Sequence, residues 1–174
     1  MIPHDPLPFP FPFPFPFRRT RVLFAAAFLA AAGCASQHQK LSPENVPAPV
    51  RAAVAQRFPG AQVTSVEREK EHGRVVYDYE LNQDGRKFET DVLEDGTLLE
   101  VEKQLAPADV PDAVSRAVAA KYPRAKVREV MEVDKVTAGR ETPDHYEVTL
   151  AGGMAGGKEV NVSVDGRVTE ETAD

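Results

Sequence analysis

The sequence predicts an α+β fold of two tandem repeats, each a helix packed on one face of a three- to four-stranded antiparallel sheet. Three observations lead to this expectation. Residues 46–63 return as residues 110–127 with nine of eighteen positions identical, which indicates an internal duplication. Each copy opens with apolar residues at helical spacing and closes that stretch with a proline. Each copy then continues in segments that alternate apolar and polar residues between glycine-containing turns.

The opening segment of each repeat is predicted to be a helix. The apolar stripe is Val50, Ala53, Val54 and Phe58 in the first copy, and Val114, Ala117, Val118 and Tyr122 in the second. Pro59 and Pro123 follow these stripes directly and should end the helices, because proline lacks the backbone N–H that a helix needs. Helices this short are not stable alone, so each should lie on a sheet.

The strands of the sheet are predicted from alternating apolar and polar residues and from the turn residues between them. The first repeat shows expected strands at 63–71, 75–81, 87–93 and 97–101, with turns at 82–85 and 94–96. The second repeat shows a strand at 127–136, another containing Tyr146, Val148 and Leu150, and a repeat of the second turn at Asp165-Gly166. One continuous sheet and two docked domains both satisfy this alternation, so the sequence leaves that choice open.

The amino terminus reads as an export signal. Arg18, Arg19 and Arg21 precede an apolar run, residues 22–32, that is too short to span a bilayer as a helix. The run ends at Cys34, the only cysteine, in a sequence that resembles a bacterial lipobox. That resemblance implies an acylated Cys34 that anchors the chain in a membrane; the alternative is an ordinary residue at the end of a signal peptide.

These features predict the domain organisation and the location. We expect a lipoprotein signal peptide at 1–33, a tether at 34–42, a first repeat at 43–105 and a second at 106–172. The expected location is the periplasmic side of a bacterial cell envelope. Ala35 after the cysteine favours the outer membrane over the inner one, by the resemblance to diderm lipoproteins.

The charge balance limits the classes of partner that the chain is expected to bind. The chain has a formal net charge of −6, and removal of residues 1–33 leaves 18 Lys and Arg against 26 Asp and Glu. Such an acidic protein is a poor partner for nucleic acid or anionic lipid. A basic protein or peptide is the better expectation.

Residues for catalysis or cofactor binding are not arranged in recognisable patterns. The four histidines, His4, His38, His72 and His145, show no ligand spacing, and the chain has no glycine-rich phosphate loop. The serines lie in no nucleophile motif. The sequence therefore predicts a protein that is not an enzyme, with no cofactor and no metal site.

The order of these elements resembles the PepSY-like family, also described as β-lactamase-inhibitor-like. The motifs are Phe58-Pro-Gly-Ala61, Tyr77-Asp-Tyr-Glu-Leu81 and Asp95-Gly96, then Tyr122-Pro-Arg-Ala125, Tyr146-Glu-Val-Thr-Leu150 and Asp165-Gly166. The resemblance implies a secreted or envelope protein with an inhibitor-type role, in which tandem repeats form a concave sheet. It carries no inhibitory contact residue over to this chain, because the family pattern contains none.

One sheet face is the candidate binding surface. If Tyr77, Tyr79 and Leu81 face the helix, strand alternation places an acidic set on the opposite face. The predicted set is Asp78, Glu80, Glu89, Asp91, His145, Glu147 and Glu159, with Asn161 beside them. The alternative interpretation is a solvated face of a two-layer sheet with no partner.

The second repeat also differs from the first by extra residues. It inserts residues 135–143 before its long strand and uses a glycine-rich stretch, 152–157, where the first repeat has a tight turn. We expect loops there, either tolerated insertions or binding loops.

Together these features predict a lipid-anchored envelope protein of binding or inhibitor type. It would recognise a protein or peptide through an open sheet face or a sheet edge. The alternative is a structural or sensing role in the envelope without an enzyme target.

Overall fold

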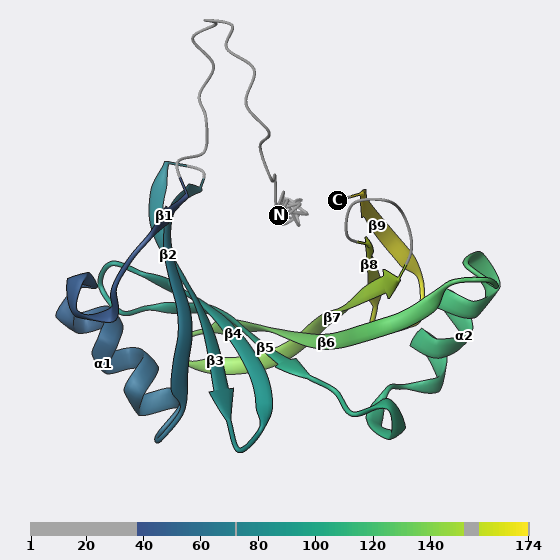
Figure 1. Ribbon diagram of the computed structural model, residues 1–174, viewed down its shortest axis with the longest axis horizontal. Helices are drawn as coiled ribbons and strands as arrows, with labels where there is room; N and C mark the ends of the chain where they lie inside the picture. The colour runs from purple at the N-terminus through teal and green to yellow at the C-terminus, as the bar shows by residue number, and fades with distance from the viewer. Residues whose placement is uncertain (1–37, 72, 152–156, 174) are drawn as a thin grey trace, which may run out of the picture.

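The described part of the chain forms one continuous sheet. The computed structural model describes residues 38–71, 73–151 and 157–173, and Figure 1 shows one curved antiparallel sheet running through them. Its nine strands lie side by side in chain order. The strands are β1 (Gln39–Lys40), β2 (Gln62–Glu71), β3 (Arg74–Gln83), β4 (Arg86–Leu93), β5 (Leu98–Gln104), β6 (Lys126–Thr137), β7 (Arg140–Ala151), β8 (Lys158–Ser163) and β9 (Val168–Ala173).

The predicted fold class is therefore wrong. The protein is mostly β, with two short helices on one nine-stranded sheet, instead of two repeats that each hold a separate three- to four-stranded sheet. The join is the pairing of β5 with β6, where Glu102 lies opposite Val133 and Lys103 lies opposite Glu132. This pairing is between segments separated by a helix, so local alternation does not reveal it.

The two halves of the sheet use the same register. Gln39 lies opposite Arg68 in the β1–β2 pair, and Lys103 lies opposite Glu132 in the β5–β6 pair. Each residue of the second pair is therefore 64 positions after its equivalent in the first pair. Gln39 and Lys40, which the sequence assigns to the tether, occupy in β1 the place that the end of β5 occupies in the second half.

Two α-helices lie on the outer side of the curved sheet, one near each end (Figure 1). They are α1 (Ala48–Arg57) and α2 (Asp112–Lys121), and each follows a short 3₁₀ turn, Pro43–Asn45 or Pro107–Asp109. Each ends two positions before a proline, at Arg57 before Pro59 and at Lys121 before Pro123. The residue after each helix completes its last turn. The Phe58 N–H donates a hydrogen bond to the Val54 carbonyl, and the Tyr122 N–H donates one to the Val118 carbonyl.

Each helix covers its own hydrophobic core. The first core lies under α1 and consists of Val46, Val50, Val54, Phe58, Val66, Tyr77, Tyr79, Leu81, Val92 and Val101. The second lies under α2 and consists of Val114, Val118, Val130, Tyr146, Val148, Leu150, Val160 and Val162. Leu81 and Tyr146 belong to one cross-strand row through Phe88, Lys103 and Glu132. Both cores therefore lie on the same face of the sheet.

The insertion at 135–143 forms strand instead of the expected loop. Its residues extend the β6–β7 hairpin, and the turn is made by Ala138 and Gly139 at φ 51° and 74°. Two positive φ values are typical of the tight hairpin turns that match strand twist. Ala-Gly is not one of the usual sequence signals for such a turn, which explains why alternation and turn residues did not predict it.

The extended hairpin contacts the first half of the molecule. Val136 packs against the first core, and the Arg57 guanidinium at the end of α1 donates two hydrogen bonds to the Glu141 carboxylate, at 2.5 and 2.8 Å. A segment of the second half thus helps to close the core of the first.

The predicted signal peptide, Cys34 and residues 152–156 of the glycine-rich stretch lie outside the described residues. Within the described part of the chain, neither helix has the length and apolar character to cross a bilayer.

Candidate binding surface

The predicted surface residues all lie on the sheet face that the helices leave uncovered. Asp78 lies opposite Asp91, and Glu80 opposite Glu89, across β3 and β4. Their neighbours in sequence, Tyr77, Tyr79 and Leu81, point into the first core, so strand alternation turns the carboxylates the other way.

The structure adds two carboxylates to this set and arranges six of them in two rows. Asp91 lies opposite Glu100, and Glu89 opposite Glu102, across β4 and β5. The rows are therefore Asp78, Asp91 and Glu100, and Glu80, Glu89 and Glu102. We call these six residues the acidic rows. Directly opposite side chains in an antiparallel pair have Cβ atoms about 5 Å apart, so like charges at these positions repel.

The acidic rows are more buried than a solvated face would be. Glu89, Asp91, Glu100 and Glu102 are each at most 4% exposed. Taking a carboxylate out of water is unfavourable unless a cation or hydrogen-bond donor replaces the water. The interpretation as a freely solvated face does not hold for these four side chains.

Lys87 supplies one cation at the edge of the rows. Its ammonium group lies 2.6 Å from Glu89 and 3.6 Å from Glu129. Burial lowers the pKa of Lys87, but the attraction of Glu89 and Glu129 outweighs it, and the pKa is raised. The first half of the surface thus already binds one lysine side chain through its carboxylates.

The second half of the surface has a different character. Glu102 pairs with Val133 and Gln104 pairs with Met131 across β5 and β6, and both apolar side chains are at most 4% exposed. Beyond this apolar strip lie His145 and Glu147 on β7. The structure therefore separates the acidic rows from the predicted residues of the second half.

His145 is the titratable centre of that second region. Its Nδ1 lies 2.9 Å from the Asp144 carboxylate and its Nε2 lies 3.6 Å from that of Glu147. Burial lowers the pKa of His145, while the two carboxylates raise it by more, so the pKa is raised overall. Glu159 lies further along the face, opposite Thr149 on β7, and Asn161 lies opposite Glu147.

Sequence reasoning missed Glu100, Glu102, Lys87 and the apolar strip. The signal for the two glutamates was present, since Val101 lies in the first core between them and alternation then places both on the opposite face. No such signal existed for Met131 and Val133, because their position depends on the β5–β6 pairing.

A small group at the first edge of the sheet has the donor atoms for a metal ion. His38 Nδ1 lies 2.5 Å from Glu69 and 4.0 Å from Glu67, and the ligand atoms of the three residues all lie within 4.8 Å of one another. The sequence predicted no metal site, because 29 residues separate His38 from Glu67. The short hydrogen bond to Glu69 accounts for the position of the ring.

The described residues form a curved antiparallel sheet, with helices on one face and rows of charged residues on the other. The chain belongs to the family described as "Putative beta-lactamase-inhibitor-like, PepSY-like", whose model matches residues 34–100 and 77–169. This confirms the resemblance that the sequence motifs indicated.

Solved structures with TM-scores above 0.5 share the fold. A "putative periplasmic" protein from Bacteroides eggerthii is 16% identical, with a TM-score of 0.57, over 73% of this chain and 88% of that one. A DUF2874 family protein from Bacteroides uniformis is 18% identical, with a TM-score of 0.56 and the same coverage. A BLIP-like protein from Bacteroides fragilis is 22% identical, with a TM-score of 0.49, over 72% of this chain and 85% of that one. A search of curated proteins finds no match to the chain.

Proposed function

We propose that this chain is a non-enzymatic binding protein of the bacterial envelope, which recognises a basic protein or peptide through the acidic rows. The observation that carries the proposal is the placement of six carboxylates at neighbouring positions on β3, β4 and β5. A lysine or arginine side chain of the partner would contact the rows at Asp78 and Glu80, which are half-buried, because the other four carboxylates are at most 4% exposed. Lys87 already makes such a contact with Glu89 at 2.6 Å.

One further observation supports a protein partner. Both described helices lie on the opposite face, so neither covers the rows. The apolar strip of Met131 and Val133 beside the rows is at most 4% exposed, so its apolar surface is already buried within the chain. The charge of the rows would speed the encounter with a basic partner.

The location and the anchor are part of the same proposal. The export signal and the family support the envelope, and a solved relative described as periplasmic agrees with it. Acylation of Cys34 would hold the domain at the periplasmic side of a membrane, the outer one by the residue that follows it. Replacement of Cys34 by Ala should abolish labelling with palmitate, and normal labelling of that variant would disprove the anchor.

The binding function is tested by affinity capture from envelope extract. The bait is the full chain, compared with a variant in which Asp78, Glu80, Glu89 and Asp91 are changed to Asn or Gln. Amides keep the shape of the side chains, so loss of a stoichiometric partner reports on charge. Capture should also weaken as salt rises, because salt screens exposed charges.

A matched control removes four charges elsewhere. Glu44, Asp84, Asp109 and Asp112 are exposed and lie off the sheet strands, so the same amide substitutions there should leave capture unchanged. A partner retained by the first variant, or lost equally from both, would exclude the acidic rows as its site. Absence of any partner would favour a structural or sensing role.

A further inference from the structure

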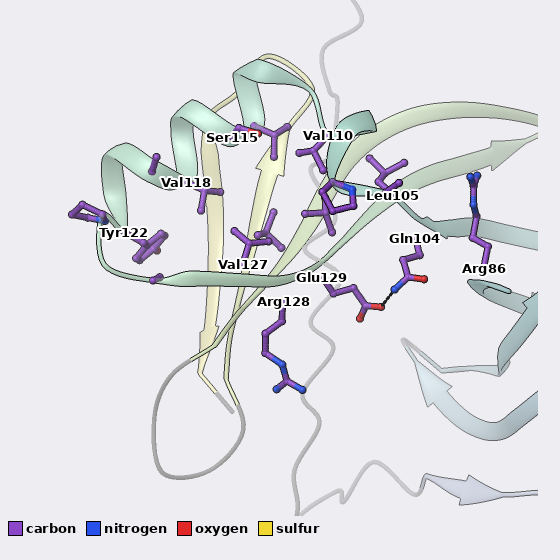
Figure 2. A pocket seen from close by; sticks show the side chains of 18 of the residues that line it. Arg86, Gln104, Leu105, Val110, Ser115, Val118, Tyr122, Val127, Arg128 and Glu129 are labelled. Atoms are coloured by element: carbon purple, nitrogen blue, oxygen red, sulfur yellow. Dashed lines mark hydrogen bonds between the residues drawn. The ribbon is translucent and has the colours of Figure 1, made fainter.

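An apolar groove lies between α2 and the beginning of β6. Figure 2 shows the side chains that line it, and its volume is about 650 Å³, within the range of ligand pockets in proteins. Most of its wall is aliphatic or aromatic; the apolar lining includes Val110, Val114, Val118, Tyr122, Val127 and Val130. We call this cavity the α2 groove.

The first half of the molecule shows what fills the equivalent space. Val148 lines the α2 groove and pairs with Val130. In the first half Tyr79 pairs with Val66, which is 64 positions before Val130. Tyr79 is only 1% exposed and its ring belongs to the first core. The second half therefore has a valine where the first half fills its core with a phenol ring.

A second residue difference between the two halves lies at the rim of the α2 groove. Ser115 lines the α2 groove, and 64 positions earlier the first helix carries Arg51. Burial raises the pKa of the Tyr79 hydroxyl, and the positive charge of Arg51 opposes part of that rise. The second helix has only a hydroxymethyl group at this place.

The polar groups of the groove are gathered at its rim. Glu129 is held by two neighbours, with the Gln104 amide donating to it at 2.9 Å and Lys87 at 3.6 Å. Arg86, the first residue of β4, lines the end of the groove beside Gln104, and Arg128 follows Val127 on β6 (Figure 2). Figure 2 shows the Arg128 side chain pointing away from α2, so Arg86 is the cation that would receive an anion at this end of the groove.

We propose that the α2 groove binds a single-chain anionic amphiphile, a free fatty-acid-like carboxylate, with its chain along α2 and its headgroup at Arg86. The stripe from Val114 to Tyr122 extends the apolar wall by about 12 Å at the rise of an α-helix. A flexible chain suits such an elongated wall of branched aliphatic side chains, and burial of its methylene groups would drive binding. Val127, at the open side of the groove, is 51% exposed, and this ligand would cover it.

The test is titration of the full chain with dodecanoate, followed by calorimetry. Binding to one site is expected, and Val148→Tyr should weaken it at least tenfold, because the new ring occupies the place that Tyr79 fills in the first half. Val164→Tyr is the matched control, since Val164 is 52% exposed in the β8–β9 turn outside the groove. Its affinity for dodecanoate should equal that of the unchanged protein.

Two further variants test binding in the α2 groove if Val148→Tyr does not fold. Ser115→Arg changes only an exposed rim position and should also weaken binding several-fold. Arg86→Gln should weaken the binding of dodecanoate about tenfold and leave the binding of dodecanol unchanged. A charge-assisted hydrogen bond to the headgroup contributes about this ratio to the affinity. No binding of dodecanoate, equal binding by folded Val148→Tyr, or binding only of extended peptides would overturn the proposal.

Discussion

The two halves of this molecule use the same strand register for two different cores. In the first half, Phe58 packs against Phe88 with ring centroids 5.5 Å apart, and Tyr79 fills the space beneath α1. In the second half, Tyr122 instead lies under the Lys158 ammonium group, 4.8 Å from the ring centroid, and Val148 leaves the α2 groove. The comparison teaches that register can be kept while one core is filled and the other is opened.

The first half is also closed from outside. Val136 and Glu141, both on the extended β6–β7 hairpin, contact the first core and the end of α1. Within the described residues, no comparable segment covers α2 in the second half. The insertion, which was expected to form a loop, therefore contributes to the stability of the other half.

The largest effect is expected from making the first core resemble the second. Tyr79→Val removes a buried ring and should lower the free energy of unfolding by about 2–4 kcal/mol, because the surroundings relax only partly around the cavity. Urea denaturation of the variant measures this loss. A loss below about 1 kcal/mol would mean that the first core collapses easily and that the contrast between the halves is weaker than the structure indicates.

The next largest effect on stability is expected from substituting two equivalent glycines, which lie in the turns beneath the helices. A Cβ at Gly96 would lie 2.8 Å from the Pro49 carbonyl oxygen, and one at Gly166 would lie 3.0 Å from Ala113, with φ values of 89° and 82°. Both alanine variants should lose stability, by about 1–3 kcal/mol, since positive φ and crowding are both unfavourable.

The ranking of the two glycine variants is the sharper expectation. Gly96→Ala should cost more than Gly166→Ala, because its nearest contact is closer, 2.8 Å against 3.0 Å. Thermal unfolding of the two variants gives the order. The reverse order would show that the second half is the more tightly packed of the two at this contact. Gly85→Ala is the control, since its φ is 80° but nothing lies within 4 Å of its Cβ position.

A smaller effect is expected from the ion pair between the halves. Glu141→Gln should cost about 0.2–1 kcal/mol near neutral pH, the usual range for partly exposed pairs. The hydrogen bond from Arg57 lowers the pKa of Glu141, so its contribution is present above the unfolded pKa and is lost as pH falls through the folded value. Stability of the two proteins measured against pH should converge in acid. A constant difference would mean that the carboxylate charge does not matter.

The smallest effect concerns the hydroxyl of Tyr79. This oxygen is buried without a hydrogen-bond partner in the described part of the structure, so Tyr79→Phe should be neutral or stabilising by up to about 1 kcal/mol. Together with Tyr79→Val it separates the role of the ring from that of the hydroxyl. A clear loss of stability in the phenylalanine variant would reveal a hidden partner for the oxygen.

Much of the local structure could be predicted from the sequence. Strands β2 and β6 were expected at 63–71 and 127–136 and are found at Gln62–Glu71 and Lys126–Thr137. The two helices were expected from their stripes and prolines and occupy those residues. These features depend on neighbours along the chain, whose effect on helix and strand formation can be judged from spacing and residue type.

The candidate surface was predictable only in part. Asp78, Glu80, Glu89 and Asp91 share the expected face because alternation within a hairpin decides it. Their burial, and the apolar strip of Val133 and Met131 beside them, follow from tertiary structure. The seven predicted residues therefore share a face but form two regions instead of one.

The sequence by itself determined the elements, the 64-residue period and the face that each strand residue takes, because helical and strand periodicities act over a few residues. Only the tertiary structure decided that β5 pairs with β6, that the extra hairpin reaches α1, and that Val148 leaves a groove where Tyr79 fills one. Each of these depends on which distant segments meet and on how much volume their side chains occupy, and periodicity carries no information about either.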